Sequence, residues 1–299
     1  PDGKRVLSGG IAGNSTLNPG ELILWEAATG EEIRRFEGSR ELVVDAVFSP
    51  DGSRVIASSG EVDYALDPAK IDKESLEYQL LIWDTTSGDL VYRSDDFWRH
   101  VTAVSISPDG RTLLATSADH NIYLLNAETG EEIAVLEAHP DLVKTAVFSP
   151  NGHKIISGGG DGGLFLWDAA KADELARFAV HTDEVNAIAF LPDGDAALSA
   201  SDDGALILWA LSNAAENGRF EGHTATVLDV AFHPNGTDLL SASGGADPAE
   251  GVVDDISLRL WDKESGTEMA ALTGHDHSIF QFAIAPDGNS ALTASIDGS

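Results

Sequence analysis

The turn Pro150-Asn151-Gly152 has copies at intervals of 42 residues, at Pro108-Asp109-Gly110, Pro192-Asp193-Gly194 and Pro234-Asn235-Gly236. Three more copies stand outside this regular run, at Pro1-Asp2-Gly3, Pro50-Asp51-Gly52 and Pro286-Asp287-Gly288. Proline presets φ and an Asn-Gly or Asp-Gly pair tolerates positive φ, so each copy predicts a tight reversal of the chain. A period of this size predicts a repeat architecture.

Each repeat contains four short segments of β type. Around Pro192 the first two span 185–190 and 196–200, and the third spans 206–209 and ends on a tryptophan. The fourth follows a further glycine turn, as 31–36 does in the first repeat. Many short strands with regular turn signals favour an all-β closed or radial architecture.

The composition limits the classes of partner that the chain is expected to bind. The chain has 50 acidic and 18 basic side chains and a formal net charge of −32, so it repels phosphate backbones and anionic lipid. We expect no nucleic acid partner, and basic proteins, basic peptides or divalent cations suit this charge better; the acidity can also serve solubility alone. No apolar run approaches 18 residues, which predicts no membrane span. The chain has no cysteine, which excludes disulfides and thiolate metal sites, and the compartment stays open, with the cytoplasm preferred over export.

Tryptophan marks the third segment of five repeats, and Leu125 stands in the equivalent place of another. The five are Trp25, Trp83, Trp167, Trp209 and Trp261. Aspartate follows three of them, at Asp84, Asp168 and Asp262, and Gly-His pairs occur at Gly222-His223 and Gly274-His275. With these motifs the chain resembles the WD40 repeat family over essentially its whole length.

The resemblance implies a structural hydrogen-bonded tetrad of histidine, hydroxyl residue, aspartate and tryptophan. Three complete sets are predicted, namely His139, Ser157, Asp161 and Trp167; His181, Ser199, Asp203 and Trp209; and His223, Ser241, Asp255 and Trp261. His275, Thr293 and Asp297 supply part of a fourth. A His-Ser-Asp set can also be a hydrolase triad, but its repetition favours bracing of buried polar groups.

Three repeats depart from the tetrad pattern. The second has Ser39 and Ala57 in the histidine and hydroxyl places. The third keeps only Asp119, beside Phe97, Ala115 and Leu125, and the first has Pro19 in the aspartate place. We expect these repeats to be less rigidly braced.

The repeat count predicts one WD40-like β-propeller domain over 1–299, with seven blades preferred and six as the second choice. Its units span about 1–37, 38–93, 94–136, 137–178, 179–220, 221–272 and 273–299. The chain begins and stops within repeats, which predicts an excerpt of a longer polypeptide. The near-identical Ser-Pro-Asp-Gly and Thr-Gly-Glu-Glu elements resemble the bacterial branch of the family, in which such domains are often appended to other modules.

Length varies at one place in the repeat. The spacing from each third-segment anchor to the next turn proline is constant at 25 residues, whereas the first, second and sixth repeats carry 7, 16 and 10 extra residues between their second and third segments. In WD40-like propellers these loops share a face with the histidine-bearing loops, and inserts on one face often mark a binding face.

We therefore predict a partner-binding surface on these inserts and beside them. Its candidate residues are Glu61, Asp63, Tyr64, Asp67, Asp72, Glu74, Glu77 and Tyr78 in the second repeat, Trp98 and Arg99 in the third, and Asp247, Glu250 and Asp254 in the sixth. Trp98 with Arg99 suits an interface hot spot; the alternative is that Trp98 packs under the long insert.

Signals for other chemistry are weak. The glycine-rich run 158–163 lacks the Lys-Ser/Thr ending and following helix of a phosphate loop. His275 and His277 could ligate a metal, but His275 has a tetrad place; the acidic inserts could chelate Ca²⁺, although no regular ligand loop is visible. No cofactor and no catalytic residue are predicted.

The sequence thus predicts a non-catalytic scaffold that binds a protein or peptide. Two alternatives stay open: a Ca²⁺-dependent or structural cell-surface module, and an enzyme using the mouth of the propeller channel. The oligomeric state is not predicted.

Overall fold

The computed structural model describes residues 2–11, 20–39, 41–60, 78–94, 101–137, 139–179, 181–244 and 255–299. These residues form strands and turns only, in two compact units that divide after Ala138. All strands pair with an antiparallel neighbour that is next to them in sequence. The predicted all-β fold is confirmed, and the single domain and the blade number stay predictions.

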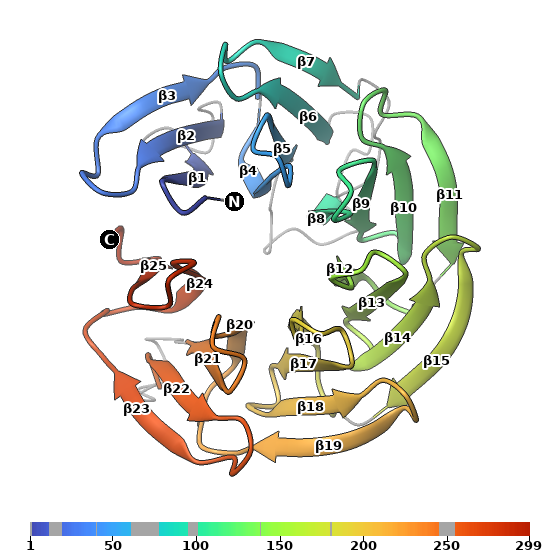
Figure 1. Ribbon diagram of the computed structural model, residues 1–299, viewed down its shortest axis with the longest axis vertical. Helices are drawn as coiled ribbons and strands as arrows, with labels where there is room; N and C mark the ends of the chain where they lie inside the picture. The colour runs from blue at the N-terminus through green and yellow to red at the C-terminus, as the bar shows by residue number, and fades with distance from the viewer. Residues whose placement is uncertain are drawn as a thin grey trace, which may run out of the picture. The chain divides into compact units, whose positions relative to one another are not determined.

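The first unit contains three sheets (Figure 1). The first has three strands, β1 (Arg5–Ile11), β2 (Gly20–Glu26) and β3 (Glu32–Phe36). The second has four, β4 (Val43–Phe48), β5 (Arg54–Ser59), β6 (Gln79–Asp84) and β7 (Leu90–Arg93). The third also has four, β8 (Val101–Ile106), β9 (Thr112–Ser117), β10 (Asn121–Asn126) and β11 (Glu132–Glu137).

The second unit contains three four-stranded sheets and a two-stranded one. The first is β12 (Val143–Phe148), β13 (Lys154–Gly159), β14 (Gly163–Asp168) and β15 (Asp173–Ala179). The next is β16 (Val185–Phe190), β17 (Ala196–Ser201), β18 (Leu206–Ala210) and β19 (Ala215–Phe220). Then come β20 (Val227–Phe232), β21 (Asp238–Ser243), β22 (Leu258–Asp262) and β23 (Glu268–Leu272), and finally β24 (Ile279–Ile284) with β25 (Ala291–Ser295).

The turn between the first two strands of a sheet depends on its glycine. Gly110, Gly152 and Gly194 have φ of 73°, 73° and 78°, a region that side chains with a Cβ rarely enter. The aspartate or asparagine before the glycine closes the turn with its side chain: Asp109 Oδ1 accepts hydrogen bonds from the Ser107 hydroxyl at 2.6 Å and from the Arg111 N–H at 3.1 Å. The repeated tripeptide therefore fixes where each hairpin reverses.

The core lies between consecutive sheets within a unit. Trp209 of β18 is buried among Ile156, Leu164 and Phe178 of the preceding sheet, and Trp261 of β22 is buried with Leu206 and Phe220 in the same manner. The ladder between third and fourth strands shifts register at each tryptophan, for example between Leu208 and Trp209. Apolar area removed from water is the main favourable term in such packing.

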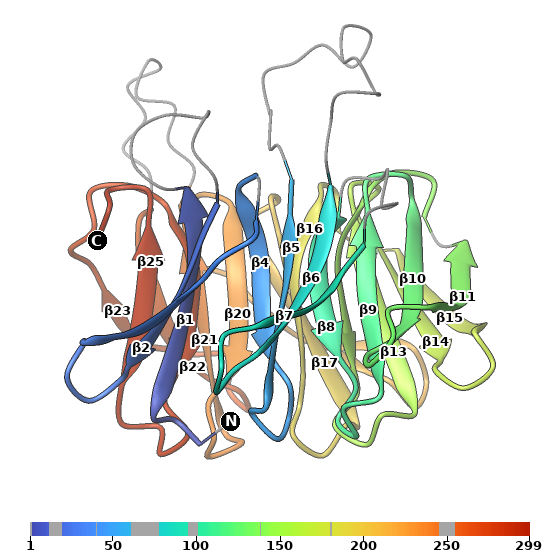
Figure 2. The same ribbon diagram turned by 90° about the horizontal axis from the view of Figure 1, so that it is seen from above.

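The histidine-bearing loops and the connections between second and third strands lie at the same end of each sheet. Backbone hydrogen bonds join the two segments, from Gly160 N to Leu142 O at 2.9 Å and from Gly244 N to Thr226 O at 3.1 Å in the second unit. In the first unit, Gly60 N donates to Leu42 O at 2.9 Å. We call this end of a sheet its histidine-loop end; in Figure 2 the turn between β4 and β5 lies at the opposite end of its sheet.

Candidate functional site

The sheet β12–β15 brings together the four residues of the first predicted set. The Trp167 indole N–H donates to Ser157 Oγ at 3.0 Å. His139 Nε2 lies 3.0 Å from the same hydroxyl, and His139 Nδ1 lies 2.8 Å from Asp161 Oδ1. With Nδ1–H donating to the carboxylate, Nε2 accepts from the serine, so each polar group is satisfied.

The next sheet repeats this geometry. Ser199 Oγ accepts from the Trp209 indole at 2.9 Å and lies 2.7 Å from His181 Nε2, while His181 Nδ1 lies 3.0 Å from Asp203 Oδ2. Asp203 also accepts from the backbone N–H groups of Thr182 and Ala205. The carboxylate thus ties the histidine loop to the turn between β17 and β18.

In the sheet β20–β23 the set includes residues from before and after the sixth insert in sequence. His223 Nε2 lies 2.7 Å from Ser241 Oγ, which accepts from the Trp261 indole at 2.8 Å. His223 Nδ1 lies 2.7 Å from Asp255 Oδ2. The partial fourth set also makes its bonds, because His275 contacts Thr293 and Asp297 at 2.7 Å each.

Burial decides what these sets can do chemically. The side chains of His139, His181 and His223 are fully buried, and burial lowers the pKa of each imidazole despite its carboxylate partner. Each serine hydroxyl already serves an indole and an imidazole and is shielded from solvent. A nucleophile must reach its substrate, so this geometry supports a bracing role.

The repeats that depart from the tetrad pattern make other hydrogen bonds. Without a hydroxyl at Ala57, the Trp83 indole donates to Glu37 O at 2.9 Å, and Ser39 Oγ donates to Glu41 O at 2.7 Å. In the third repeat the Tyr123 hydroxyl donates to Asp119 Oδ2 at 2.7 Å. The sequence did not predict this pair, because the tetrad pattern has no place for Tyr123; the four-residue spacing of Asp119 and Tyr123 was the available signal.

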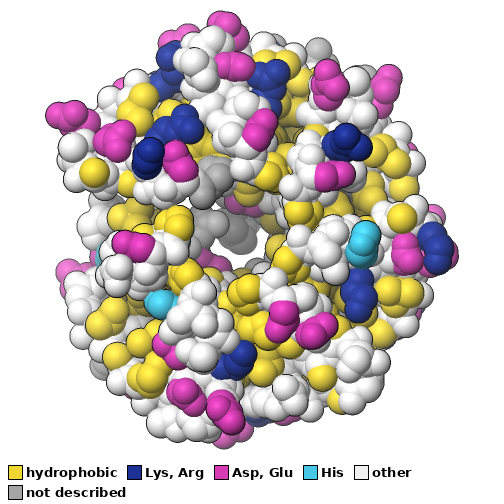
Figure 3. All heavy atoms as spheres, in the orientation of Figure 1, with side chains coloured by type: hydrophobic (Ala, Val, Ile, Leu, Met, Phe, Trp, Pro, Cys, Tyr) yellow, Lys and Arg dark blue, Asp and Glu magenta, His cyan; other side chains and the backbone are white. Residues whose placement is uncertain are grey.

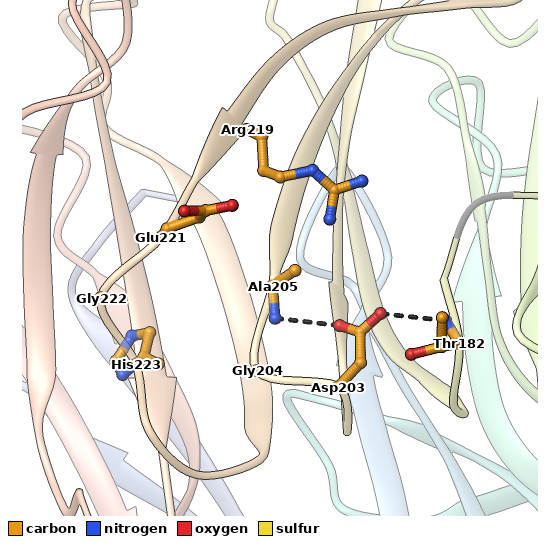
Figure 4. A pocket seen from close by; sticks show the side chains of 8 residues that line it. All are labelled: Thr182, Asp203, Gly204, Ala205, Arg219, Glu221, Gly222 and His223. Carbon is orange, nitrogen blue, oxygen red and sulfur yellow. Dashed lines mark hydrogen bonds between the residues drawn. The ribbon is translucent and has the colours of Figure 1, made fainter.

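A pocket of about 360 Å³ opens at the histidine-loop end of the second unit, between the sheets β16–β19 and β20–β23 (Figure 4). Its lining comes from the histidine loops, the β17–β18 turn and the end of β19; it consists of Thr182, Asp203, Gly204, Ala205, Arg219, Glu221, Gly222 and His223. Three of these residues are glycine or alanine, and their small size leaves the space open.

Equivalent arginines show how this junction differs from its neighbours. Arg177 pairs with Glu174 at 2.6 Å and lies over the Phe165 ring, 4.7 Å from its centroid. Arg219 faces the smaller Ile207 and pairs with Glu216 at 3.2 Å. Arg219 borders the pocket, and its side chain is 30% exposed against 62% for Arg177.

In the sheet β20–β23 the arginine has moved to the third strand. Arg259 lies opposite Ala271 in the ladder, whereas in the two preceding sheets the arginine lies on the fourth strand. Its guanidinium donates to Asp255 at 2.8 Å and to Glu268 at 2.7 Å. In these three sheets the tetrad aspartate therefore lies near a guanidinium, whether the third or the fourth strand supplies the arginine.

The pocket is negatively charged in sum. Asp203 has its pKa lowered: burial opposes ionisation, but the hydrogen bonds from Ala205 and Thr182 N–H and from His181 outweigh it. The Arg219 guanidinium is balanced by Glu216, whose hydrogen bond raises the arginine pKa. Glu221 makes no hydrogen bond or ion pair with another described residue and is exposed. Asp203, Glu216 and Glu221 all interact with the single positive charge of Arg219, so the carboxylates at the pocket outnumber its cation.

Most of the predicted partner-binding residues lie outside the described residues. These are Glu61, Asp63, Tyr64, Asp67, Asp72, Glu74, Glu77, Trp98, Arg99, Asp247, Glu250 and Asp254. Tyr78 is described: it is half-buried, and its ring lies so close to Gly60 that a Cβ there would collide with it. Sequence reasoning did not select Thr182, Arg219 or Glu221, although the recurrence of arginine at 177 and 219 was a signal.

Figure 3 shows one face of the molecule. Acidic and basic side chains lie interspersed on it, with apolar atoms between them. In the described part of the chain, no group of three or more histidine, aspartate or glutamate side chains could hold a metal ion. No helix among these residues is long and apolar enough to cross a membrane.

The repeated sheets and tetrads define a propeller-type repeat protein. The family described as "WD domain, G-beta repeat" matches residues 93–126, 130–168, 173–210, 215–262 and 266–299. The chain belongs to the WD40 repeat family, which confirms the resemblance found in the sequence and supports a role as a protein-interaction scaffold.

Two curated relatives cover short parts of the chain. Eukaryotic translation initiation factor 3 subunit I of Scheffersomyces stipitis is 29% identical over 116 residues, which are 39% of this chain and 33% of the relative. Coronin-7 of Rattus norvegicus is 43% identical over 44 residues, which are 15% of this chain and 5% of the relative. The matches thus span a third or less of either relative.

Proposed function

We propose that the chain is a non-catalytic scaffold that binds a protein or peptide partner through the histidine-loop end of its sheets. The observation that carries this proposal is the pocket at this end between β16–β19 and β20–β23. The name of one relative, a subunit of a translation initiation factor, is in keeping with a role in assembly. The inserts of the first, second and sixth repeats also bind the partner in this proposal.

The partner presents a lysine or arginine side chain to the pocket. Glu221 supplies the facing carboxylate, and Thr182 and the exposed backbone at Gly222 provide further polar contacts. The formal charge of −32 adds long-range attraction for a basic partner and speeds its association. A rim carboxylate contributes mostly to association rate and specificity, so charge reversal is the sharpest perturbation.

The domain also belongs to a larger bacterial protein in this proposal. Its support is the style of the repeats alone, and the two relatives named above come from eukaryotes.

The test is affinity capture followed by measured binding. The closed propeller is immobilised and used to identify a partner. The dissociation constant of that partner is then measured for Glu221→Lys and for charge reversal of the acidic residues in 61–77. We expect each change to weaken binding about tenfold, which is about 1.4 kcal/mol, and to flatten its salt dependence.

Asp195→Lys is the matched control, because Asp195 is exposed at the opposite end of the same sheet. A partner that binds Glu221→Lys and the charge-reversed insert as tightly as the wild type would overturn the proposed binding face.

A further inference from the structure

The sheet β20–β23 shows how this fold holds a guanidinium beside a tetrad aspartate. The Arg259 guanidinium donates to Asp255 at 2.8 Å and to Glu268 at 2.7 Å. Its side chain is only 14% exposed. Charge-assisted hydrogen bonds of this kind are about twice as strong as neutral ones. The repeat can therefore accommodate one guanidinium between these two carboxylates.

The neighbouring sheet β16–β19 has the same two carboxylates but not this arginine. Asp203 is its tetrad aspartate, and Glu216 has the ladder position that Glu268 has in the other sheet. In place of Arg259, opposite the tetrad serine, stands Ile207. This side chain is fully buried and carries no donor. The third strand of β16–β19 therefore supplies no cation to Asp203.

The hydrogen bonds of the two aspartates differ by one partner. Asp255 accepts four, from His223, the Thr224 N–H, the Ser257 hydroxyl and Arg259. Asp203 accepts three from the described residues, namely from His181 and the N–H groups of Thr182 and Ala205. A carboxylate has about four lone-pair positions. Asp203 is therefore left with one unused position, and the partner that it lacks relative to Asp255 is the guanidinium.

Arg219 does not fill this position. It lies on the fourth strand, opposite Ile207, and directs its guanidinium to Glu216 with both N–O distances at 3.2 Å. Its positive charge still acts on Asp203, but Glu216 and Glu221 share it. A second cation at the pocket would therefore be attracted by carboxylates that Arg219 alone does not neutralise.

The pocket gives a partner access to Asp203 (Figure 4). Asp203, Arg219 and Glu221 all line its space of about 360 Å³. The Asp203 side chain is 11% exposed, whereas Glu221 is exposed. A side chain that enters from solvent thus passes the Glu221 carboxylate and meets Asp203 deeper in the pocket.

These carboxylates favour a guanidinium over an ammonium ion. A guanidinium is weakly hydrated and carries its donors in a planar fork, whereas the lysine ammonium is a strongly hydrated point charge. Partial burial beside Asp203 therefore costs arginine less than lysine. We propose that the pocket selects an arginine side chain of the partner, which donates to Asp203 as Arg259 donates to Asp255. The choice of arginine rests on the proposed function, because it specifies the side chain that the partner presents.

Small probes and local signals test this arginine site. The probes are the N-acetyl methylamides of arginine, lysine and citrulline, the last of which keeps the shape of arginine without its charge. Each is titrated into the isotope-labelled wild-type chain while the amide signals of Thr182 and Ala205 are followed by NMR, because both N–H groups donate to Asp203. We expect the arginine probe to shift both signals and to bind about tenfold more tightly than the lysine probe, and the citrulline probe to shift neither.

A double variant copies the next sheet. Ile207→Arg combined with Arg219→Ala reproduces the pair of Arg259 and Ala271. An internal guanidinium should then reach Asp203 and abolish binding of the arginine probe.

A single variant tests the charge of the pocket. Glu221→Gln changes one exposed residue and should weaken binding of the arginine probe severalfold, so the test stays decisive when the double variant does not fold. Asp195→Asn, at an exposed residue of the opposite end of the same sheet, is the matched control and should leave the affinity unchanged.

Saturable shifts with the arginine probe that exceed those of lysine in affinity and are lost in the double variant would support the arginine site. Equal affinities for arginine and lysine would overturn the selectivity, while the proposed function stands because the pocket still binds a cation. No shift with any probe, or arginine binding that neither variant weakens, would overturn the site. Binding of the captured partner to Glu221→Lys then tests the proposed function independently.

Discussion

At the scale of single residues, the repeats of this chain serve as internal controls for one another. The turn between third and fourth strands has a glycine at Gly30, Gly88, Gly130 and Gly266, with φ between 69° and 81°. The same place is occupied by Ala172 and Ala214, with φ of 59° and 52°. A residue with a Cβ is strained in this left-handed region, so these two alanines reduce stability.

We expect Ala214→Gly to raise the free energy of unfolding by about 1 kcal/mol, because relief of left-handed strain exceeds the added freedom of glycine in the unfolded chain. Gly30→Ala is the matched reverse change: no atom lies within 4 Å of its added Cβ, so only the backbone conformation is tested. Urea unfolding of both variants measures the effect. Equal stability of Ala214→Gly and the wild type would show that the alanine is not strained.

The buried histidines predict a pH dependence of stability. Burial lowers the pKa values of His139, His181 and His223 below the ordinary 6.5. A group with a lowered folded-state pKa stabilises the fold above its unfolded pKa, and the contribution is lost as pH falls through the folded value. We therefore expect the free energy of unfolding to begin falling below pH 6.5.

Urea titrations at several pH values measure this fall, with His181→Gln as the variant. Its profile should be shallower than that of the wild type, because one buried imidazole no longer takes up a proton on unfolding. The pKa of Asp203 and Asp255 is lowered from 3.8, so their contribution is lost only at more acidic pH. Identical profiles for the variant and the wild type would contradict the assignment to His181.

At the scale of elements, two aspartates join neighbouring first strands. Asp229 on β20 accepts from the Phe282 N–H on β24 at 2.9 Å, and Asp45 on β4 accepts from the Val104 N–H on β8 at 2.8 Å. Burial raises the pKa of Asp45, against the hydrogen bonds it accepts from Val104 and Ala46. Such bonds tie one sheet to the next through the backbone and not only through apolar packing.

We expect Asp229→Ala to reduce the free energy of unfolding by about 1–3 kcal/mol, because it leaves the Phe282 N–H without its partner. Hydrogen exchange at the amides of β24 should accelerate more than exchange at β12. Asp173→Ala, at an exposed aspartate of the same unit, is the control. Unchanged exchange at Phe282 would mean that the carboxylate does not hold the two strands together.

At the scale of the whole molecule, charge is the dominant property. A formal net charge of −32 makes the compact state repel itself, and salt screens this repulsion. The Debye length falls from about 30 Å at 0.01 M salt to about 8 Å at 0.15 M. Stability should therefore rise with ionic strength over this range.

We expect the melting temperature to rise by a few degrees, roughly the effect of 1–2 kcal/mol, when sodium chloride is raised from about 0.01 to 0.15 M. Potassium chloride should act equally. Calcium chloride at matched ionic strength separates screening from specific binding, since a much larger rise would favour the Ca²⁺-dependent module. A melting temperature that is insensitive to both sodium and potassium salts would contradict the screening argument.

The sequence by itself determined the repeats, the strands and the tetrads. Turn tripeptides and short apolar segments act over a few residues, so their spacing predicts strands such as β16 and β17, and fixed offsets select sets such as His181, Ser199 and Asp203. The same local reasoning selected charged residues of the inserts as the partner surface, and that selection stays a prediction.

Only the tertiary structure decided the contacts between sheets. The pocket exists because Gly204 and Gly222, from different repeats, leave space beside Arg219. In the sheet β20–β23 the arginine stands on the third strand, at Arg259, and in the second repeat Ser39 Oγ donates to Glu41 O. Each of these contacts depends on the size and geometry of side chains that come from different segments of the chain. A repeat period contains no information about how such side chains fit together.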